Sequence, residues 1–188
     1  MNLNLKHYIK KFDNFLDKDL CEKTIIELKN CKWEQHQFYD TKTQKYVTVS
    51  GEKELDNTFE SVSTNEIIMN KIWHSLKNYT EDLKFNWFNG WQGYSKIKYN
   101  CYYDDKKMAE HCDHIHSLFD GKIKGIPILS IVGLLNNNFE GGEFIMFENE
   151  KINFNQGDLI IFPSIFLYPH RVEPVKKGTR YSYVSWVW

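Results

Sequence analysis

The amino-acid sequence predicts an α+β fold in which helices in the first half support a sandwich or jelly roll of short strands in the second half. Three observations carry this prediction. Apolar residues recur at helical spacing in the first half, short β-prone runs broken by Gly, Asn and Pro follow from Trp91 onward, and no helical pattern separates these runs. Because parallel strands need long crossover connections, an antiparallel sandwich fits this order better than a sheet of βαβ units.

The length of the chain indicates a single domain. Its 188 residues are enough for one well-buried core and too few for two ordinary domains. We therefore expect one domain over residues 1–188, with helical support and a hairpin up to about residue 90 and a jelly-roll core from about residue 91 to 188.

Two helices are expected in the first half. Asp17 gives an N-cap signal for the first helix, and the segment 63–66, with sequence STNE, is a capping box for the second. Helical spacing after this box is shown by Met69, Ile72, Trp73, Leu76 and Leu83. A helix is therefore predicted over about residues 64–84, with one face packed on the core.

A hairpin is predicted between the two helices. An aromatic strand over 33–39, a polar turn over 40–43 and a β-branched run over 46–49 are followed by a loose tail over 50–56. Such hairpins usually belong only to the surface, but one that lies next to an active site can serve as a lid.

The strands of the second half are short. They are expected over residues 94–102, 128–135, 144–147, 159–162 and 180–188.

Composition excludes several classes of partner. The net charge of -1 leaves no excess of Lys and Arg to neutralise a nucleic-acid backbone. No apolar segment has the length of a membrane span, and the N-terminus lacks the apolar stretch of a signal peptide. The 4 cysteines show no C-x-x-C spacing, so free thiols are expected. We expect a soluble cytoplasmic protein with no nucleic-acid or membrane partner.

Candidate metal ligands occur in the triplet His111-Cys112-Asp113 and at His170. Two imidazoles and one carboxylate are the ligand set of a non-haem Fe(II) site with open coordination positions. Residues two apart on an extended strand project to the same face, so His111 and Asp113 can bind one ion while Cys112 points away. The segment before His170 reads as a turn, a buried strand and a strand-ending Pro, which can bring a third ligand across a barrel mouth.

The last predicted strand carries a candidate anion site. Arg180 and Ser182 lie two residues apart at its start, so both side chains can face one cavity, and Trp186 has the same parity. A buried guanidinium is costly without a partner and matches a carboxylate in two-point contact. Arg180 therefore predicts an acidic ligand.

The ordered set of residues in the second half resembles a known enzyme family. This set comprises Tyr99, His111-Cys112-Asp113, Leu135-Asn136, Phe139-Glu140-Gly141-Gly142-Glu143-Phe144, Gly157-Asp158, Phe162-Pro163, His170-Arg171-Val172, Val175, Gly178, Arg180-Tyr181-Ser182 and Trp186. It is similar to the Fe(II)- and 2-oxoglutarate-dependent dioxygenases, and within them most similar to the prolyl 4-hydroxylase branch. The resemblance implies a double-stranded β-helix (jelly-roll) core supported by the N-terminal helices.

The resemblance also implies roles for individual residues. His111, Asp113 and His170 would bind Fe(II), while Arg180, aided by Ser182 and Tyr99, would hold the far carboxylate of 2-oxoglutarate. O2 would be the second cosubstrate, ascorbate is a candidate cofactor, and Trp186 is a candidate substrate contact.

The implied reaction is hydroxylation of a prolyl residue in a peptide or protein, with release of succinate and CO2. The same chemistry on a free amino acid or another small molecule is the alternative. A non-catalytic jelly-roll binding module is a third hypothesis, which the intact set of charged residues argues against. The sequence makes no prediction about oligomeric state.

The sequence departs from the family pattern in two places. Leu134 stands where many relatives carry a Tyr that contacts the cosubstrate, and the segment 114–125 looks longer than usual. His114 and His116 in that segment, with Glu143 and His170, also resemble a cupin-like ligand set. Cupins usually place a Glu a few residues after the second His, and none is present there, so the cupin-like site is the weaker hypothesis.

Overall fold

The computed structural model describes residues 4–40, 42–43, 45–48, 53–84, 93–113 and 127–188. The helices are the short 3-10 helix η1 (Leu5–Tyr8), α1 (Lys18–Leu28) and α2 (Asn65–Leu83). The strands are β1 (Lys10–Phe12), β2 (Glu34–Gln35), β3 (Phe38–Asp40), β4 (Lys45–Val47), β5 (Asp56–Thr58), β6 (Lys98–Tyr102), β7 (Met108–His111), β8 (Leu129–Leu134), β9 (Phe139–Gly141), β10 (Phe144–Met146), β11 (Glu150–Lys151), β12 (Leu159–Pro163), β13 (His170–Val172), β14 (Val175–Gly178) and β15 (Arg180–Val187).

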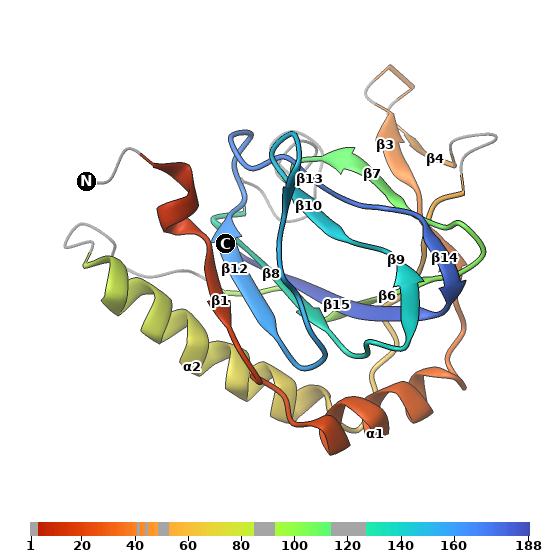
Figure 1. Cartoon of the computed structure of the whole chain (residues 1–188), viewed down its shortest axis with the longest axis horizontal. Helices are drawn as coiled ribbons and strands as arrows, with labels where there is room; N and C mark the ends of the chain where they lie inside the picture. The colour runs from red at the N-terminus through yellow and green to blue at the C-terminus, as the bar shows by residue number, and fades with distance from the viewer. Residues whose placement is uncertain (1–3, 41, 44, 49–52, 85–92, 114–126) are drawn as a thin grey trace.

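Two antiparallel sheets form the sandwich (Figure 1). The large sheet has the strand order β1-β12-β8-β15-β6-β5-β2, and the small sheet has the order β11-β10-β13-β7. Two-stranded pairs, β14 with β9 and β3 with β4, complete the described strands. This arrangement confirms the predicted α+β jelly-roll fold.

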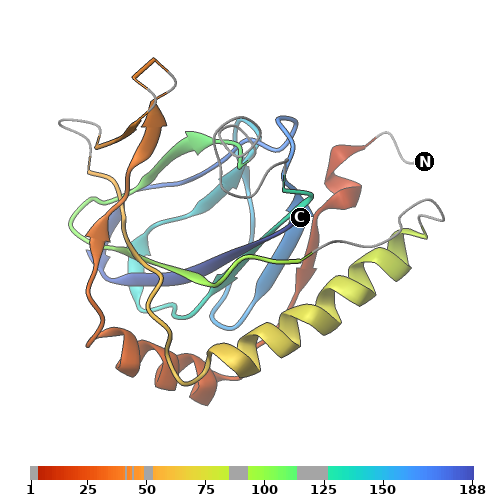
Figure 2. The same cartoon turned by 180° about the vertical axis from the view of Figure 1, so that it is seen from behind.

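The large sheet separates two hydrophobic layers. One face packs on α1 and α2, with Ile68, Ile72 and Leu76 of α2 fully buried against residues of β6, β8, β12 and β15. The other face meets the small sheet in a second cluster that includes Phe144 and Phe162. Figures 1 and 2 show both helices lying along the outer face of the large sheet. The space between the sheets, where polar residues interrupt the second cluster, holds the site described below.

The starts of the two helices differ from each other. Asp17 caps α1 as predicted, because its carboxylate accepts a hydrogen bond from the backbone N–H of Leu20 at 2.8 Å. The capping box predicted for α2 is wrong: the N-cap Thr64 forms no side-chain cap bond, and Ser63 donates from both its N–H and its hydroxyl to Glu27 of α1. A tertiary contact between the helices therefore replaces the local cap.

The predicted hairpin exists but is shorter than expected. The pair β3–β4 forms it, whereas β2 leaves the predicted first strand and joins the large sheet against β5. The predicted loose tail is wrong from residue 53 onward, since Glu54, Leu55 and Asp56 are buried and Asp56 begins β5. The rest of that tail lies outside the described residues.

Two further findings bear on the sequence predictions. All 4 cysteines are free, as predicted. Within the described ranges, no helix has both the length and the apolar character needed to cross a membrane.

Candidate metal centre

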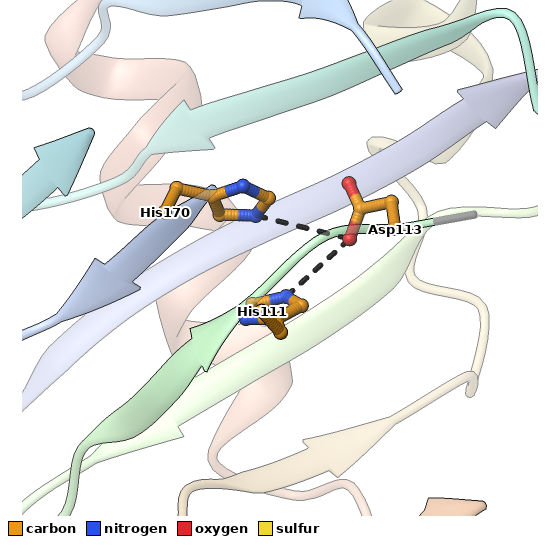
Figure 3. A group of neighbouring side chains, drawn as sticks. All are labelled: His111, Asp113 and His170. Carbon is orange, nitrogen blue, oxygen red and sulfur yellow. Dashed lines mark ion pairs between the residues drawn. The ribbon is translucent and has the colours of Figure 1, made fainter. Parts of the chain in front are cut away.

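The three candidate ligands converge between the two sheets (Figure 3). His111 ends β7 and His170 begins β13, and the two residues are paired directly across these antiparallel strands. Nε2 of His111 lies 3.3 Å from Oδ1 of Asp113, and Nε2 of His170 lies 3.8 Å from the same oxygen. One ligand atom from each residue lies within 4.8 Å of the other two. The prediction that these side chains meet therefore agrees with the geometry.

One local detail of the prediction is wrong. The strand β7 ends at His111, so Asp113 lies two residues beyond it, in a turn rather than on an extended strand. The turn still directs the carboxylate toward both imidazoles (Figure 3). Cys112 points elsewhere, with its Sγ 3.4 Å from the carbonyl oxygen of Phe166.

Neighbouring groups fix the orientation of each ligand. Nδ1 of His111 is 2.9 Å from the carbonyl of Ala109, and Nδ1 of His170 is 3.1 Å from the carbonyl of Tyr168. A carbonyl accepts only from a protonated nitrogen, so we assign a proton to Nδ1 of each ring, which leaves Nε2 as the nitrogen that can bind a metal. This is the backbone support that metal-binding histidines commonly have.

Asp113 is held by a pair of buried serines that sequence reasoning missed. Ser130 donates from Oγ to Oδ2 of Asp113 at 2.5 Å and is itself 2.7 Å from Oγ of Ser164. Oδ1 remains directed toward the imidazoles. The sequence feature that could have identified Ser130 is that it is the single hydroxyl residue in an otherwise apolar buried strand, β8.

The electrostatics of the triad suit a divalent cation. Burial, the largest cause, together with the neighbouring His111, lowers the pKa of His170 to about 4, so this imidazole is neutral at pH 7. Burial opposes ionisation of Asp113, but the imidazoles and the Ser130 hydroxyl outweigh it and hold the pKa of the carboxyl below its usual range. A neutral imidazole and an ionised carboxylate are the states that bind metals.

The donor set fits Fe(II) rather than structural zinc. No thiolate or fourth ligand joins this group in the part of the chain that the structure describes. Two nitrogens and one carboxylate oxygen with open positions match the facial arrangement of non-haem Fe(II) oxygenases.

Next to the triad lies a cavity between the sheets with a buried guanidinium in its wall. Arg180 is only 1% exposed, and its Nη1 donates to Oγ of Ser182 at 2.9 Å. The guanidinium carbon lies 4.9 Å from the centroid of the Tyr102 ring. Nε of Arg180 is buried and has no hydrogen-bond partner among the described residues. A buried cation with an unpartnered N–H fits a carboxylate ligand, so these residues suit one end of 2-oxoglutarate.

The contact predicted for Tyr99 is wrong. Successive residues of β6 face opposite sides of the sheet, and Tyr99 faces the helices, where its hydroxyl is 2.7 Å from Oδ1 of Asn65. Tyr102 lines the cavity and pairs directly with Arg180 across β6 and β15. Sequence reasoning missed Tyr102, although the strand register would have identified it.

The structure also places the candidate substrate contact Trp186 and the arginine next to His170, Arg171. Trp186 lines the cavity on the same face as Arg180 and Ser182. Arg171 points outward, where its Nε donates to Glu173 at 2.8 Å.

The cupin-like alternative receives no support from Glu143, which pairs with Lys151 at 3.2 Å. His114 and His116 lie outside the described residues.

Leu134 is one of the two departures from the family pattern, and its surroundings show what this part of β8 packs against. It ends β8 opposite Ser182, is buried, and supplies no hydroxyl. Its neighbour Gly133 lies directly under the ring of Tyr183, where a Cβ would come within 2.0 Å of a ring carbon. The backbone here is therefore adapted to a ring from β15.

Comparisons with known proteins agree with this site. The family model of the 2OG-Fe(II) oxygenase superfamily matches residues 97–188. A PKHD-type hydroxylase from Xylella fastidiosa is 31% identical over 107 residues, which cover 48% of this chain and 43% of the relative. The matched segments span less than half the length of the first curated relatives.

Solved structures with the same fold are more distant in sequence. A Trichoplax adhaerens prolyl hydroxylase, in complex with a hypoxia inducible factor oxygen degradation domain peptide fragment, has a TM-score of 0.71 at 17% identity, covering 96% of this chain and 83% of that one. A viral collagen prolyl hydroxylase from Paramecium Bursaria Chlorella virus-1 has a TM-score of 0.67 at 16% identity, covering 96% and 95%. The half of the chain that carries the triad therefore resembles the 2OG-Fe(II) oxygenase superfamily in sequence, and the whole described fold resembles that of these prolyl hydroxylase structures.

Proposed function

We propose that this chain is an Fe(II)- and 2-oxoglutarate-dependent dioxygenase that hydroxylates a prolyl residue in a peptide or protein, with release of succinate and CO2. The observation that carries the proposal is the shared cavity of a facial metal triad and a buried arginine with an unpartnered N–H. A metal site alone would fit many functions, and a buried cation alone would fit many anions. Their combination fits the two ends of 2-oxoglutarate.

Each group in the cavity has a distinct role in this proposal. His111, Asp113 and His170 would hold the iron, and Arg180 with Ser182 and Tyr102 would bind the far carboxylate of the cosubstrate. When bound, iron supplies the activation of O2 that, coupled to decarboxylation of 2-oxoglutarate, inserts oxygen into a C–H bond.

The protein contributes orientation and a dry environment. The serine pair holds Asp113, the backbone carbonyls hold the imidazoles, and apolar walls such as Phe144 and Val132 exclude water.

An open groove supports a peptide as the substrate. The groove is lined by Asp113 together with residues of β2 and β5, such as Gln35 and Asn57, and by the aromatic residues Phe59 and Trp188. Trp186 lines both the inner cavity and this groove, which suits the proposed contact with substrate. A relative of the same fold is described with a peptide fragment. A groove outside the inner cavity leaves room for a peptide chain that passes the metal, whereas a small molecule needs only the inner cavity.

The test is a direct search for hydroxylation. Protein loaded with Fe(II) would be incubated with 2-oxoglutarate, with and without ascorbate, and with either proline-rich peptides or free proline. A gain of about 16 Da by mass spectrometry on a peptide, together with succinate, is expected; the same gain on free proline alone would favour the small-molecule alternative. Asp113→Ala should abolish succinate formation, because it removes the only anionic ligand of the triad.

A binding measurement separates an enzyme from a non-catalytic module. Titration calorimetry with Mn(II) should show one site in the native protein. Failure to bind either Mn(II) or Fe(II) would contradict the proposed function and favour the jelly-roll binding module.

A further inference from the structure

A second buried cation lies in the same cavity and has no role in the proposed chemistry. Lys98 begins β6, pairs with Val184 of β15, and is 8% exposed. Its Nζ forms no hydrogen bond or ion pair with any residue in the described part of the chain. It lies 5.8 Å from the centroid of the Trp186 ring, a weak stabilising contact for a cation.

The groups that face Lys98 do not neutralise it. Asp113 is the nearby carboxylate, but it lies beyond ion-pair distance and is already engaged by Ser130 and the two imidazoles. His36, which also lines the groove, is neutral, because burial, reinforced by the charge of Lys98, lowers its pKa to about 3. Burial lowers the pKa of Lys98 to about 8, which still leaves it protonated at pH 7.

Among the described residues, the rim of the groove offers no compensating acid either. Glu34 lines the groove but is an exposed residue whose carboxylate lies 3.4 Å from Nζ of Lys32. A buried, unpaired ammonium is expensive, and proteins usually retain one only where a ligand or a function uses it.

Lys98 lies toward the mouth of the cavity, and Arg180 lies deeper. Both line the inner cavity, but Lys98 also lines the outer groove together with Asp113, whereas Arg180 does not. Along β6, Lys98 lies four positions from Tyr102, the partner of Arg180, which is about 13 Å of strand. The two cations therefore serve opposite ends of the site, and an anion bound at Arg180 does not satisfy Lys98.

A charge count gives the same result. Of the residues that the structure describes, the charged ones that line the inner cavity are Lys98, Arg180 and Asp113. A divalent iron adds two positive charges and 2-oxoglutarate removes two, so one positive charge remains when both are bound. A single carboxylate on the remaining ligand would neutralise it.

We propose that Lys98 binds a carboxylate of the primary substrate, so that the hydroxylated molecule carries a negative charge close to the reacting carbon. This inference rests on the proposed function and narrows its substrate class. The carboxylate has two possible sources, the α-carboxylate of a free amino acid or an acidic side chain next to the prolyl residue of a peptide.

Matched probes distinguish these sources. Protein loaded with Mn(II) and 2-oxoglutarate, which does not turn over, would be titrated with L-proline and L-prolinamide, and with capped prolyl-aspartyl and prolyl-asparaginyl peptides. We expect the acidic member of one pair to bind at least about tenfold more tightly than its amide. The amide carries no charge, so it leaves the buried ammonium of Lys98 without a partner. The pair that shows the preference identifies the source.

Variants assign the preference to Lys98. Lys98→Met and Lys98→Gln should reduce it to less than about twofold while 2-oxoglutarate affinity stays within about threefold of the native value. Lys96→Met is the matched control, since Lys96 is exposed in the same segment, and it should keep the full preference.

Three results would overturn the proposal. These are an unchanged preference in both Lys98 variants, a loss of 2-oxoglutarate affinity as large as that caused by changing Arg180, and the absence of any acid preference in the native protein. Failure of the proposed function gives a different result, since the native protein would then bind neither Mn(II) nor 2-oxoglutarate.

Discussion

Replacing Lys98 with Met should stabilise the metal-free protein. Burial lowers the pKa of Lys98 from 10.5 to about 8. At about 1.4 kcal/mol per pH unit, the folded protein loses roughly 3 kcal/mol by keeping this ammonium at pH 7. Met has a similar length and fills the same space without a charge. For a chain of this size, the gain corresponds to a rise in Tm of roughly 6–12 °C.

The pH dependence separates the charge from the packing. Because the folded pKa is lowered, the unfolded chain holds the proton more tightly, and the destabilisation is fully present below about pH 8. It fades as the pH rises toward 10.5, where Lys98 is neutral in both states. The stability gap between Lys98→Met and the native protein should therefore shrink to about 1 kcal/mol near pH 10. Any gain from the apolar side chain itself would persist there.

Urea unfolding of metal-free native protein, Lys98→Met and Lys96→Met at pH 7 and pH 10 measures both quantities. The control variant should match the native protein at each pH. If Lys98→Met were no more stable than the native protein at pH 7, the ammonium would have a partner or full hydration, and the argument that it awaits an anionic ligand would fail.

Three other substitutions test the site and its support. Arg180→Met should weaken 2-oxoglutarate binding by about 2–5 kcal/mol, the usual loss for a buried charge pair, and an unchanged Kd by calorimetry would show that another residue anchors the cosubstrate. Ser130→Ala removes the hydroxyl that orients Asp113 and should lower Mn(II) affinity about 10- to 100-fold, whereas native affinity would mean that the carboxylate is held by the fold alone. Gly133→Ala places a Cβ against the Tyr183 ring and should cost about 1–3 kcal/mol of unfolding free energy in urea; a neutral result would mean that the ring moves aside freely.

Local patterns predicted those parts of the fold that local physics controls. The helix α2 follows from apolar spacing, and the metal triad follows from residue types that have few uses together in a buried setting. The α2 capping box failed because Ser63 found a stronger acceptor in Glu27, which is far away in sequence. No window of sequence around residue 63 contains that information.

The two faces of β6 show a second limit of prediction from sequence. In the run from Lys98 to Cys101, strongly polar residues alternate with a Tyr and a Cys, a pattern typical of a half-exposed strand with Lys98 and Asn100 in water. All five residues of β6 are in fact buried, because the helices cover one face and the small sheet covers the other. Tyr99 and Tyr102 cannot be ranked as ligand contacts until the register against β15 is known.

The register between β6 and β15 links the supporting helices to the site, because contacts on the helix side decide which residues of β6 face the cavity. A slip of β6 by one residue against β15 would turn Lys98 into the apolar layer under α2 while Arg180 kept its place, so the alternation on the two faces of β6 must be satisfied together. On the helix face, Tyr99 packs at 6.4 Å from Tyr183 and bonds to Asn65 of α2. Those contacts, which lie outside the cavity, hold the strands in the only register that presents both cations to it. The N-terminal helices α1 and α2 therefore help to fix which charged side chains face the cavity, and so which ligand charge it accepts, although none of their residues lines the cavity.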